Sequence, residues 1–512
     1  MPDPGDAAIA AGISVDAFVW SWICFSMARP AESSPERNVM THRTKRKYQG
    51  QSSAAQDPSR REFMRTAACA AVGTAAVASS ILDLRMISAA AAATVPTDYK
   101  ALVCLFLYGG NDGNNLLIPT DASTYANYAA ARSALTISQT QTLPLSPLTN
   151  DGHTYGLHPS CTELQSLFNS GKCAILSNVG TLIAPITQSQ FFNGGVAVPA
   201  NLFSHNDQQV LWQTSIADQP SNTGWGGRCA DLLHFANGNA QVSMSITLNG
   251  SNTFEIGNAV GQYSVTPQGT IGLTNISAQT QQAIQQIMAV PRTNLYENEF
   301  QTITTRAIAN NALVGGALAA APVLKSTFPN TALGNQLAMI AKLISVRSQL
   351  GHNRQIFFAS VSGYDTHGGQ GAATGGHANL LKELSACMSS LYSATVELGV
   401  SNNVTQFTAS DFGRSLGFNG GGSDHGWGNH QLIVGGSVQG RKIYGTFPTL
   451  APYAAPGIFG PNDTGMGRWI PTTSVEEYSA TMAKWFGVSP TDMTTVFPNI
   501  GRFAHPDLGF MG

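Results

Sequence analysis

Residues 410–430, SDFGRSLGFNGGGSDHGWGNH, place two aspartates and two histidines around a glycine-rich turn, in a chain with only 11% charged residues. Carboxylates and imidazoles are the side chains that divalent cations use as ligands. Asp112 follows one apolar segment, and Asp365 and His367 follow another. We predict a site for one or two divalent cations, zinc first and otherwise manganese, calcium or magnesium. Its predicted ligands are Asp112, Asp365, His367, Asp411, His425 and His430.

Each of these residues has an ordinary alternative when taken alone, because a loop Asp usually forms a turn or caps a helix. The prediction depends on their occurring together. Asp424 is either a further ligand or, as we favour, the partner that holds His425 in one tautomer. Arg414 either binds a substrate oxyanion, which would make it catalytic, or pairs with a neighbouring carboxylate.

A candidate nucleophile lies in residues 201–215, NLFSHNDQQVLWQTS, where Ser204 comes just before a predicted helix. Free backbone N–H groups at a helix N-terminus favour an anion or a developing alkoxide. The alternative is that Ser204 is an ordinary N-cap residue. His205 and His158 are further candidates for ligand or substrate contact, although a structural role is more common for such residues.

Alternating strands and helices must position these residues. Continuous apolar segments that end in loops predict buried strands; they lie at 101–110, 172–180, 354–363 and 403–413. Helical patterns lie between them at 161–171, 206–215, 330–351 and 376–399. This order predicts an α/β fold with three α/β/α layers and a mostly parallel central sheet. Ligands bind such sheets at the carboxyl ends of the strands, where the loops carrying Asp112, Asp365 and Asp411 should meet.

One domain is predicted over residues 94–512, with insertions near 181–200 and 255–330 that cover the sheet. Near its end, residues 474–500 predict a helix that begins after Ser474, followed by a short helix or turn.

The N-terminal 93 residues are predicted to be an export leader. Residues 59–82 contain a Ser, paired arginines, Phe63 and an Ala-rich stretch, which resembles a twin-arginine signal. The twin-arginine machinery would then be a partner, and the mature protein would be periplasmic or secreted. Residues 1–58 are either disordered or the product of a misassigned start, with Met40 a candidate for the true start.

The charge balance of the mature chain excludes some partner classes. The leader holds 10 of the 27 Lys and Arg and 8 of the 29 Asp and Glu, which leaves 17 bases and 21 acids. A net charge near −4 gives no reason to expect a nucleic acid or an anionic membrane as partner. No segment outside the leader reaches the roughly 20 apolar residues of a membrane helix.

Five cysteines remain outside the leader, at an odd number and irregular spacing that match neither a disulfide framework nor a C-x-x-C metal site. A bridge between Cys161 and Cys173 is one possibility. Buried free thiols are the expectation.

Several segments together resemble a family of twin-arginine-exported bacterial proteins of unknown function, classed with the alkaline phosphatase and sulfatase superfamily. They run in order over about 102–445: LVCLFLYGGNDGNNLLIP, LHPSCTELQSLFNSGKCAILSNVG, FSHNDQQVLWQT, GWGGRCADLL, SGYDTHGGQ and SDFGRSLGFNGGGSDHGWGNHQLIVGGSVQGRKIYG. The resemblance implies an alkaline-phosphatase-like fold and a metal-dependent hydrolase of phosphate or sulfate esters. Ser204 stands where a nucleophile is expected, and the substrate would be a small or polymer-linked ester.

Two departures from this superfamily limit the implied chemistry. Phe412 stands where the His of a strand-ending Asp-His pair is expected, although His425 or His430 could replace that ligand. None of the seven cysteines lies in the C-x-P/A-x-R motif of formylglycine sulfatases. A binding or surface-assembly protein without catalytic activity therefore stays an alternative.

Overall fold

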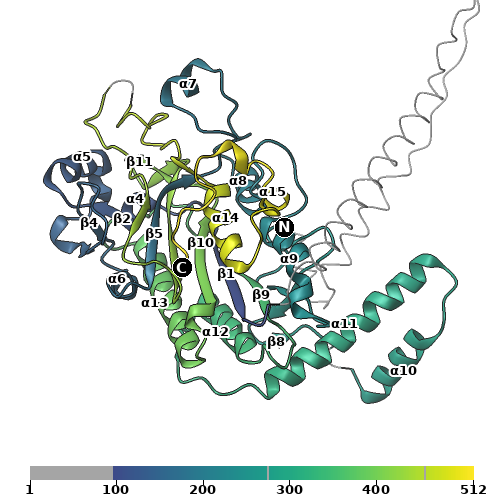
Figure 1. Cartoon of the computed structure of the whole chain (residues 1–512). Coiled ribbons are helices and arrows are strands. Elements are labelled where there is room, and N and C mark those ends of the chain that lie inside the picture. Colours follow the sequence, from purple (N-terminus) through teal and green to yellow (C-terminus); the bar gives the residue numbers. More distant parts are fainter. Residues whose placement is uncertain (1–95, 274–275, 455–456) are drawn as a thin grey trace, which may run out of the picture. The chain divides into compact units, whose positions relative to one another are not determined.

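The computed structural model describes residues 96–512, apart from 274–275 and 455–456. A ten-stranded sheet runs through this part of the chain in the order β14-β5-β13-β10-β1-β9-β6-β7-β8, with β15 also paired to β5 (Figure 1). Its strands are β1 (Lys100–Leu107), β5 (Cys173–Gly180), β6 (Ser245–Thr247), β7 (Tyr263–Thr266), β8 (Gly269–Thr270), β9 (Arg354–Val361), β10 (Val404–Ser410), β13 (Asn429–Gly435), β14 (Ile443–Gly445) and β15 (Thr473–Ser474). The leader predicted at 1–93 lies outside the described residues.

Most pairings in this sheet are parallel, as predicted. Strand β1 pairs in parallel with both β9 and β10, and β6 pairs in parallel with β9 and β7. Strand β13 runs antiparallel to its neighbours β10 and β5, and the short β8 runs antiparallel to β7. The carboxyl ends of β9, β1 and β10 therefore lie side by side at one edge of the sheet.

The sheet is covered on both faces because its central strands are apolar on both sides. In β1, Val103 and Leu105 belong to one hydrophobic cluster, whereas Cys104 and Phe106 belong to the other. The first cluster includes residues of α6 (Thr162–Asn169), α12 (Ala332–Ser345) and α13 (Gly376–Glu397). The second includes residues of α8 (His205–Thr214), α9 (Trp225–Leu233), α14 (Val475–Phe486) and α15 (Met493–Val496). These helices give the predicted three-layer arrangement.

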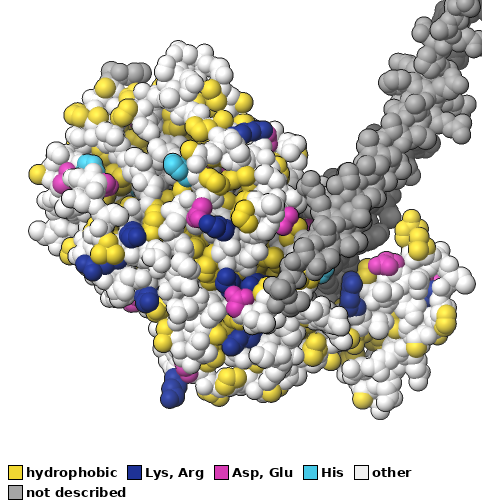
Figure 2. Space-filling model, in the orientation of Figure 1, with side chains coloured by type: hydrophobic (Ala, Val, Ile, Leu, Met, Phe, Trp, Pro, Cys, Tyr) yellow, Lys and Arg dark blue, Asp and Glu magenta, His cyan; other side chains and the backbone are white. Residues whose placement is uncertain are grey.

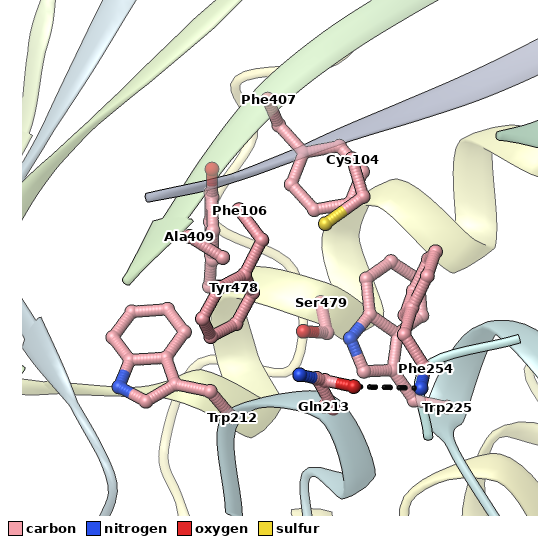
Figure 3. A pocket seen from close by; sticks show the side chains of 10 residues that line it. All are labelled: Cys104, Phe106, Trp212, Gln213, Trp225, Phe254, Phe407, Ala409, Tyr478 and Ser479. Carbon is pink, nitrogen blue, oxygen red and sulfur yellow. Dashed lines mark hydrogen bonds between the residues drawn. The ribbon is translucent and has the colours of Figure 1, made fainter. Parts of the chain in front are cut away.

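A small cavity in the second cluster lies between β1, α8, α9 and α14, and aromatic rings line most of it (Figure 3). The space is about 10 Å³, close to the least that one water molecule needs. The Gln213 amide oxygen accepts the backbone N–H groups of Thr253 and Phe254, so this polar side chain is satisfied. The cavity is a packing feature of the core.

Smaller elements surround the carboxyl edge of the sheet. A three-stranded sheet has the order β2-β4-β3, and β11 pairs with β12 as a hairpin. The bounds are β2 (Leu117–Pro119), β3 (Leu143–Pro144), β4 (Tyr155–Leu157), β11 (Arg414–Phe418), β12 (Ser423–His425), α4 (Gly113–Leu116) and α5 (Ala122–Arg132). Short 3-10 turns are η1 (Ser133–Leu135), η2 (Gln139–Gln141), η3 (His234–Asn237), η4 (Ser401–Asn403) and η5 (Ile500–Arg502).

The two predicted insertions differ from each other. Residues 181–200 form a mostly exposed loop that carries α7 (Gln188–Asn193). Residues 255–330 add β7 and β8 to the sheet and then form the helices α10 (Ala278–Ala289) and α11 (Leu295–Ala319). These two helices carry exposed apolar side chains (Figure 2), among them Leu295, Tyr296 and Phe300.

The C-terminal helix begins as predicted. Ser474 is its N-cap and forms a capping box with Glu477, in which each side chain bonds the backbone N–H of the other residue. The five cysteines of the described part are all free and buried, so Cys161 and Cys173 form no bridge. Among the described residues, no helix is both long enough and apolar enough to cross a membrane.

We predict that Glu476→Gln stabilises the protein more at pH 8 than at pH 5. Burial raises the pKa of Glu476 to about 8. Above its unfolded pKa of about 4.5 the unfolded chain releases this proton while the folded chain retains it, so stability falls as pH rises to about 8. Urea unfolding should show a gain of about 1 kcal/mol or more at pH 8, because a shift of one pKa unit corresponds to about 1.4 kcal/mol.

The neighbouring Glu477→Gln is the matched control. The Glu477 carboxylate accepts the backbone N–H of Ser474 and of His505, and its loss should destabilise by about 0.5–2 kcal/mol. A gain in stability from Glu477→Gln would contradict this account. So would a stability change from Glu476→Gln that is the same at pH 5 and pH 8.

Candidate metal centre

Three loops meet at the carboxyl ends of β9, β1 and β10, and two glycines after β1 let them approach closely. Gly109 and Gly110 have φ values of +116° and +84°. A Cβ at Gly109 would lie 2.3 Å from the Asp365 amide nitrogen, and one at Gly110 would lie 2.6 Å from the Phe412 ring. The glycine pair in YGGND therefore leaves room for the backbone at Asp365 and for the Phe412 ring to pack against this loop.

Four side chains converge in front of these loops. The Asp365 carboxylate is central, with Oδ1 at 3.3 Å from His367 Nε2 and 3.4 Å from His425 Nε2. Its Oδ2 lies 3.5 Å from His205 Nε2. The Nε2 atoms of His367 and His425 are only 2.8 Å apart. We refer to His205, Asp365, His367 and His425 as the metal centre.

The other ring nitrogen of each histidine faces a group that can only accept a hydrogen bond. The three Nδ1 contacts are His205 with Asp411 Oδ2 at 2.6 Å, His367 with Asp424 Oδ1 at 3.0 Å and His425 with the Phe203 carbonyl at 2.7 Å. Each Nδ1 therefore carries the hydrogen, and each neutral ring presents a lone pair at Nε2. Three lone pairs and a carboxylate facing one another repel unless a cation or additional protons lie between them.

Local charges agree with this arrangement. The hydrogen bond to Asp411 raises the pKa of His205, whereas burial lowers the pKa of His425. Burial alone would raise the pKa of Asp365, but the hydrogen bond and charge of Arg414 outweigh it and hold that pKa below its ordinary value. Asp365 is thus ionised at neutral pH, and protons compete with a cation for His205 at low pH.

The donor set fits a divalent cation. The ligand atoms of His205, Asp365 and His425 all lie within 4.8 Å of one another, and His367 borders two of them. Three imidazoles and a carboxylate are ligands that zinc accepts in tetrahedral sites. Behind them, Asp411 is fully buried and its Oδ1 has no hydrogen-bond partner within the described residues.

Three predicted ligands lie outside the metal centre: Asp411 is behind it as the partner of His205, and Asp112 and His430 lie elsewhere. Asp112 is buried in an ion pair with Arg132 and caps α4 through the Asn114 amide. His430 belongs to β13, and its Nδ1 faces Ser177 Oγ at 3.0 Å. Its ring stacks on Phe447 at 5.3 Å between centroids. Their side chains satisfy neighbouring elements, so neither belongs to the metal centre.

Arg414 has one of its two expected roles, whereas Asp424 has a partner different from the favoured one. Arg414 is buried and donates to Asp365 Oδ1 at 2.7 Å and to the Gly109 carbonyl at 3.1 Å, which is the ion-pair alternative. Asp424 orients His367, whereas the Phe203 carbonyl orients His425.

Phe412 lies between two histidine rings. Its centroid is 4.9 Å from that of His205 and 4.6 Å from that of His425. The side chain is buried and offers no ligand atom, so it contributes packing where a histidine was expected.

Helix α8 contributes His205, a candidate ligand for which a structural role was the more common expectation. His205 is its first residue, and Gln209, one turn later, also donates to Asp411 Oδ2, at 3.0 Å. The signal is a His and a polar residue at i and i+4, which share one helix face. His158 is buried, and its Nε2 contacts the Ala372 carbonyl, so it has the structural role that was expected.

Ser204 is the N-cap residue of α8, yet its side chain caps no backbone N–H group. Within the described residues its hydroxyl makes no hydrogen bond. Its chain neighbour His205 belongs to the metal centre and contacts Asp411. The carbonyl of its other neighbour, Phe203, orients His425.

Comparison with known families decides which family contains this chain. The family described as "Protein of unknown function (DUF1501)" matches residues 99–490. The chain belongs to the DUF1501 family. The matched region includes every residue of the metal centre, together with Ser204, Asp411 and Arg414. No curated protein matches the sequence of this DUF1501 protein significantly.

Solved structures that resemble this DUF1501 protein do so weakly. They include the PsFucS1 sulfatase from Pseudoalteromonas sp., with 11% identity, coverage of 80% of this chain and 72% of that chain, and a TM-score of 0.33. The C-terminal periplasmic domain of EcEptC from Escherichia coli in complex with Zn has 12% identity, coverage of 67% and 74%, and a TM-score of 0.23. The phosphonate monoester hydrolase of Agrobacterium radiobacter has 11% identity, coverage of 76% and 74%, and a TM-score of 0.24. We therefore infer the site from the geometry of this chain and not from these structures.

We predict that the purified DUF1501 protein binds about one zinc ion per chain and that His205→Ala weakens this binding by more than about 100-fold. Asp411→Asn should weaken it by about 10- to 100-fold, because it removes the charge that orients His205. The affinity for zinc should also decrease as the pH is lowered, because His205 then takes a second proton. Elemental analysis and competition with a fluorescent chelator would measure these changes.

His430→Gln serves as the comparison, since His430 was a predicted ligand that the fold places elsewhere. It should leave zinc content and affinity unchanged. Loss of zinc from this variant, or full retention by His205→Ala, would contradict the assignment.

Proposed function

We propose that this protein is an exported metal-dependent hydrolase of phosphate or sulfate esters, with zinc as the first choice of metal. One observation carries the proposal. Three imidazole lone pairs and the Asp365 carboxylate converge at a partly exposed place on the carboxyl edge of the sheet. The side chains of Asp365 and His367 are each 46% exposed, so an ester can reach them.

A divalent cation bound there would polarise an ester oxygen and lower the pKa of a hydroxyl group beside it. The protein's own contribution is to fix this geometry. Asp411, Asp424 and the Phe203 carbonyl each hold one histidine in the tautomer with Nε2 free. Arg414 keeps Asp365 ionised and in place.

Ser204 is our proposed nucleophile. Its free hydroxyl lies at the N-terminus of α8, where backbone N–H groups and the helix dipole stabilise negative charge. In the first step Ser204 Oγ bonds to phosphorus or sulfur while the bond to the ester oxygen breaks, and the serine proton passes through water to that oxygen, which leaves as the alcohol. In the second step a water oxygen bonds to phosphorus or sulfur, the bond to Ser204 Oγ breaks, and a proton of that water returns to Oγ.

The proposed location is the periplasm or the exterior, and the proposed substrate is a small or polymer-linked ester. The paired arginines and Ala-rich stretch of residues 59–82 support export by the twin-arginine machinery.

We expect Ser204→Ala to lower kcat/KM for aryl phosphate or sulfate esters by about 1,000-fold or more, because no other group replaces a lost nucleophile fully. Zinc content should not change, because Ser204 is not a ligand. Turnover of p-nitrophenyl phosphate, bis(p-nitrophenyl) phosphate and p-nitrophenyl sulfate by zinc-loaded protein would measure the effect.

Ser277→Ala is the matched control, because Ser277 is the N-cap of α10 and is exposed. It should retain full activity. Zinc-loaded wild-type protein that hydrolyses none of these esters would refute the hydrolase proposal and favour a binding protein on the same fold.

A further inference from the structure

Arg468 lies beside the metal centre. Its Nε donates to the His425 carbonyl at 2.8 Å, and its guanidinium carbon lies 5.0 Å from the centroid of the Phe203 ring. His425 is a residue of the metal centre, and the Phe203 carbonyl orients His425. The guanidinium therefore contacts a residue of the metal centre on one side and a residue that orients His425 on the other.

A buried carboxylate fixes the turn that carries Arg468. Asp463 is fully buried and accepts four backbone N–H groups. They are those of Phe459 at 2.8 Å, Gly465 at 2.7 Å, Gly467 at 2.9 Å and Arg468 at 2.9 Å. Both the backbone and the Nε of Arg468 are thus fixed before any ligand arrives, which reduces the entropic cost of binding.

The two terminal nitrogens of Arg468 remain available. Within the described residues, neither makes a hydrogen bond or an ion pair, and the residue is partly exposed. Arg414, by contrast, is buried and committed to Asp365 and to the carbonyls of Gly109 and Ser423. The Arg414 Nε has no hydrogen-bond partner within the described residues but is buried, so of these two arginines Arg468 is the one that a ligand can reach from solvent. A guanidinium suits a tetrahedral oxyanion.

The charges around the centre also indicate the charge of that ligand. Asp365, Asp411 and Asp424 are opposed by Arg414 and Arg468, so these five side chains together carry one negative charge. The imidazoles are neutral when they act as ligands, so a divalent cation brings the total to one positive charge. A singly charged ester would neutralise this site, whereas a doubly charged one would leave an excess negative charge in a partly buried place.

We propose that Arg468 binds the charged oxygen of the substrate, and that the substrate is a singly charged tetrahedral ester, either a sulfate monoester or a phosphate diester. This inference rests on the proposed function, because it assigns the ligand of the same site.

The test compares zinc-loaded wild-type protein with Arg468→Gln, Arg468→Lys and Arg347→Gln. Arg347 is the matched control: it stacks on Tyr99 at 4.9 Å in the same manner but precedes β9, at the opposite edge of the sheet. Calorimetry measures the affinity for methanesulfonate, a singly charged tetrahedral oxyanion, and kinetics compare p-nitrophenyl sulfate and bis(p-nitrophenyl) phosphate with p-nitrophenyl phosphate. Zinc content is measured for every variant.

Arg468→Gln should weaken methanesulfonate binding and lower kcat/KM for singly charged esters by about 10- to 100-fold, as expected for the loss of charge-assisted hydrogen bonds. Zinc content should stay unchanged. Arg468→Lys should lie between this variant and wild type, because it retains the charge without the planar donors. Arg347→Gln should match wild type, and wild type should prefer the singly charged esters.

Three results would overturn the inference and leave the hydrolase proposal standing: equal methanesulfonate affinity in wild type and Arg468→Gln, no methanesulfonate binding by an active zinc-loaded wild type, or a preference for p-nitrophenyl phosphate. If Arg468→Gln does not fold, wild-type methanesulfonate affinity and kcat/KM in Arg468→Lys would overturn the role of Arg468. Wild-type protein without zinc or without turnover would instead refute the proposed function.

Discussion

The hydrogen bond between His205 Nδ1 and Asp411 Oδ2 connects the sheet to the site. Asp411 follows β10 and is fully buried, and its Oδ2 also accepts from Gln209 of α8 and from the Gly109 amide after β1. One carboxylate thus fixes a helix, a loop and the tautomer of a ligand. The positions of Phe203 and Ser204 follow from it, because both residues directly precede α8. The rest of the site depends on this short contact, because it joins two residues that are 206 positions apart in the sequence.

The sequence predicts the strands of the sheet well, because local patterns of apolar residues indicate which segments are buried. Continuous apolar segments locate β1, β5, β9 and β10, and the carboxyl-edge rule brings Asp365, His367 and Asp411 to one place. Side-chain direction is harder to predict. His430 lies at a register irregularity between Asn429 and Gln431 in β13, and its Nδ1 faces Ser177 of β5. The partner of Asp112 is Arg132 of α5, which no short-range pattern indicates. The role of His205 depends on tertiary packing that a single sequence does not reveal.

Phe412 shows how a departure from an expected motif can still have a clear physical role. Its ring contacts His205 and His425 and fills the space left by Gly110. A buried aromatic ring restrains both imidazoles and excludes water from one side, which strengthens the electrostatic interactions there. The described residues supply four ligand side chains around one place, and Phe412 occupies the position from which a further ligand was expected.

None of the four residues of the metal centre belongs to the ten-stranded sheet. His205 begins a helix, Asp365 and His367 lie in a loop, and His425 lies in the separate β11–β12 hairpin. The hydrogen-bond ladders that hold the domain together therefore do not include the groups that would perform the chemistry. Replacement of a loop that carries one of these four residues would change which ion or substrate binds while the hydrogen bonds of the sheet stay intact. Specificity and folding can therefore be altered separately in this architecture.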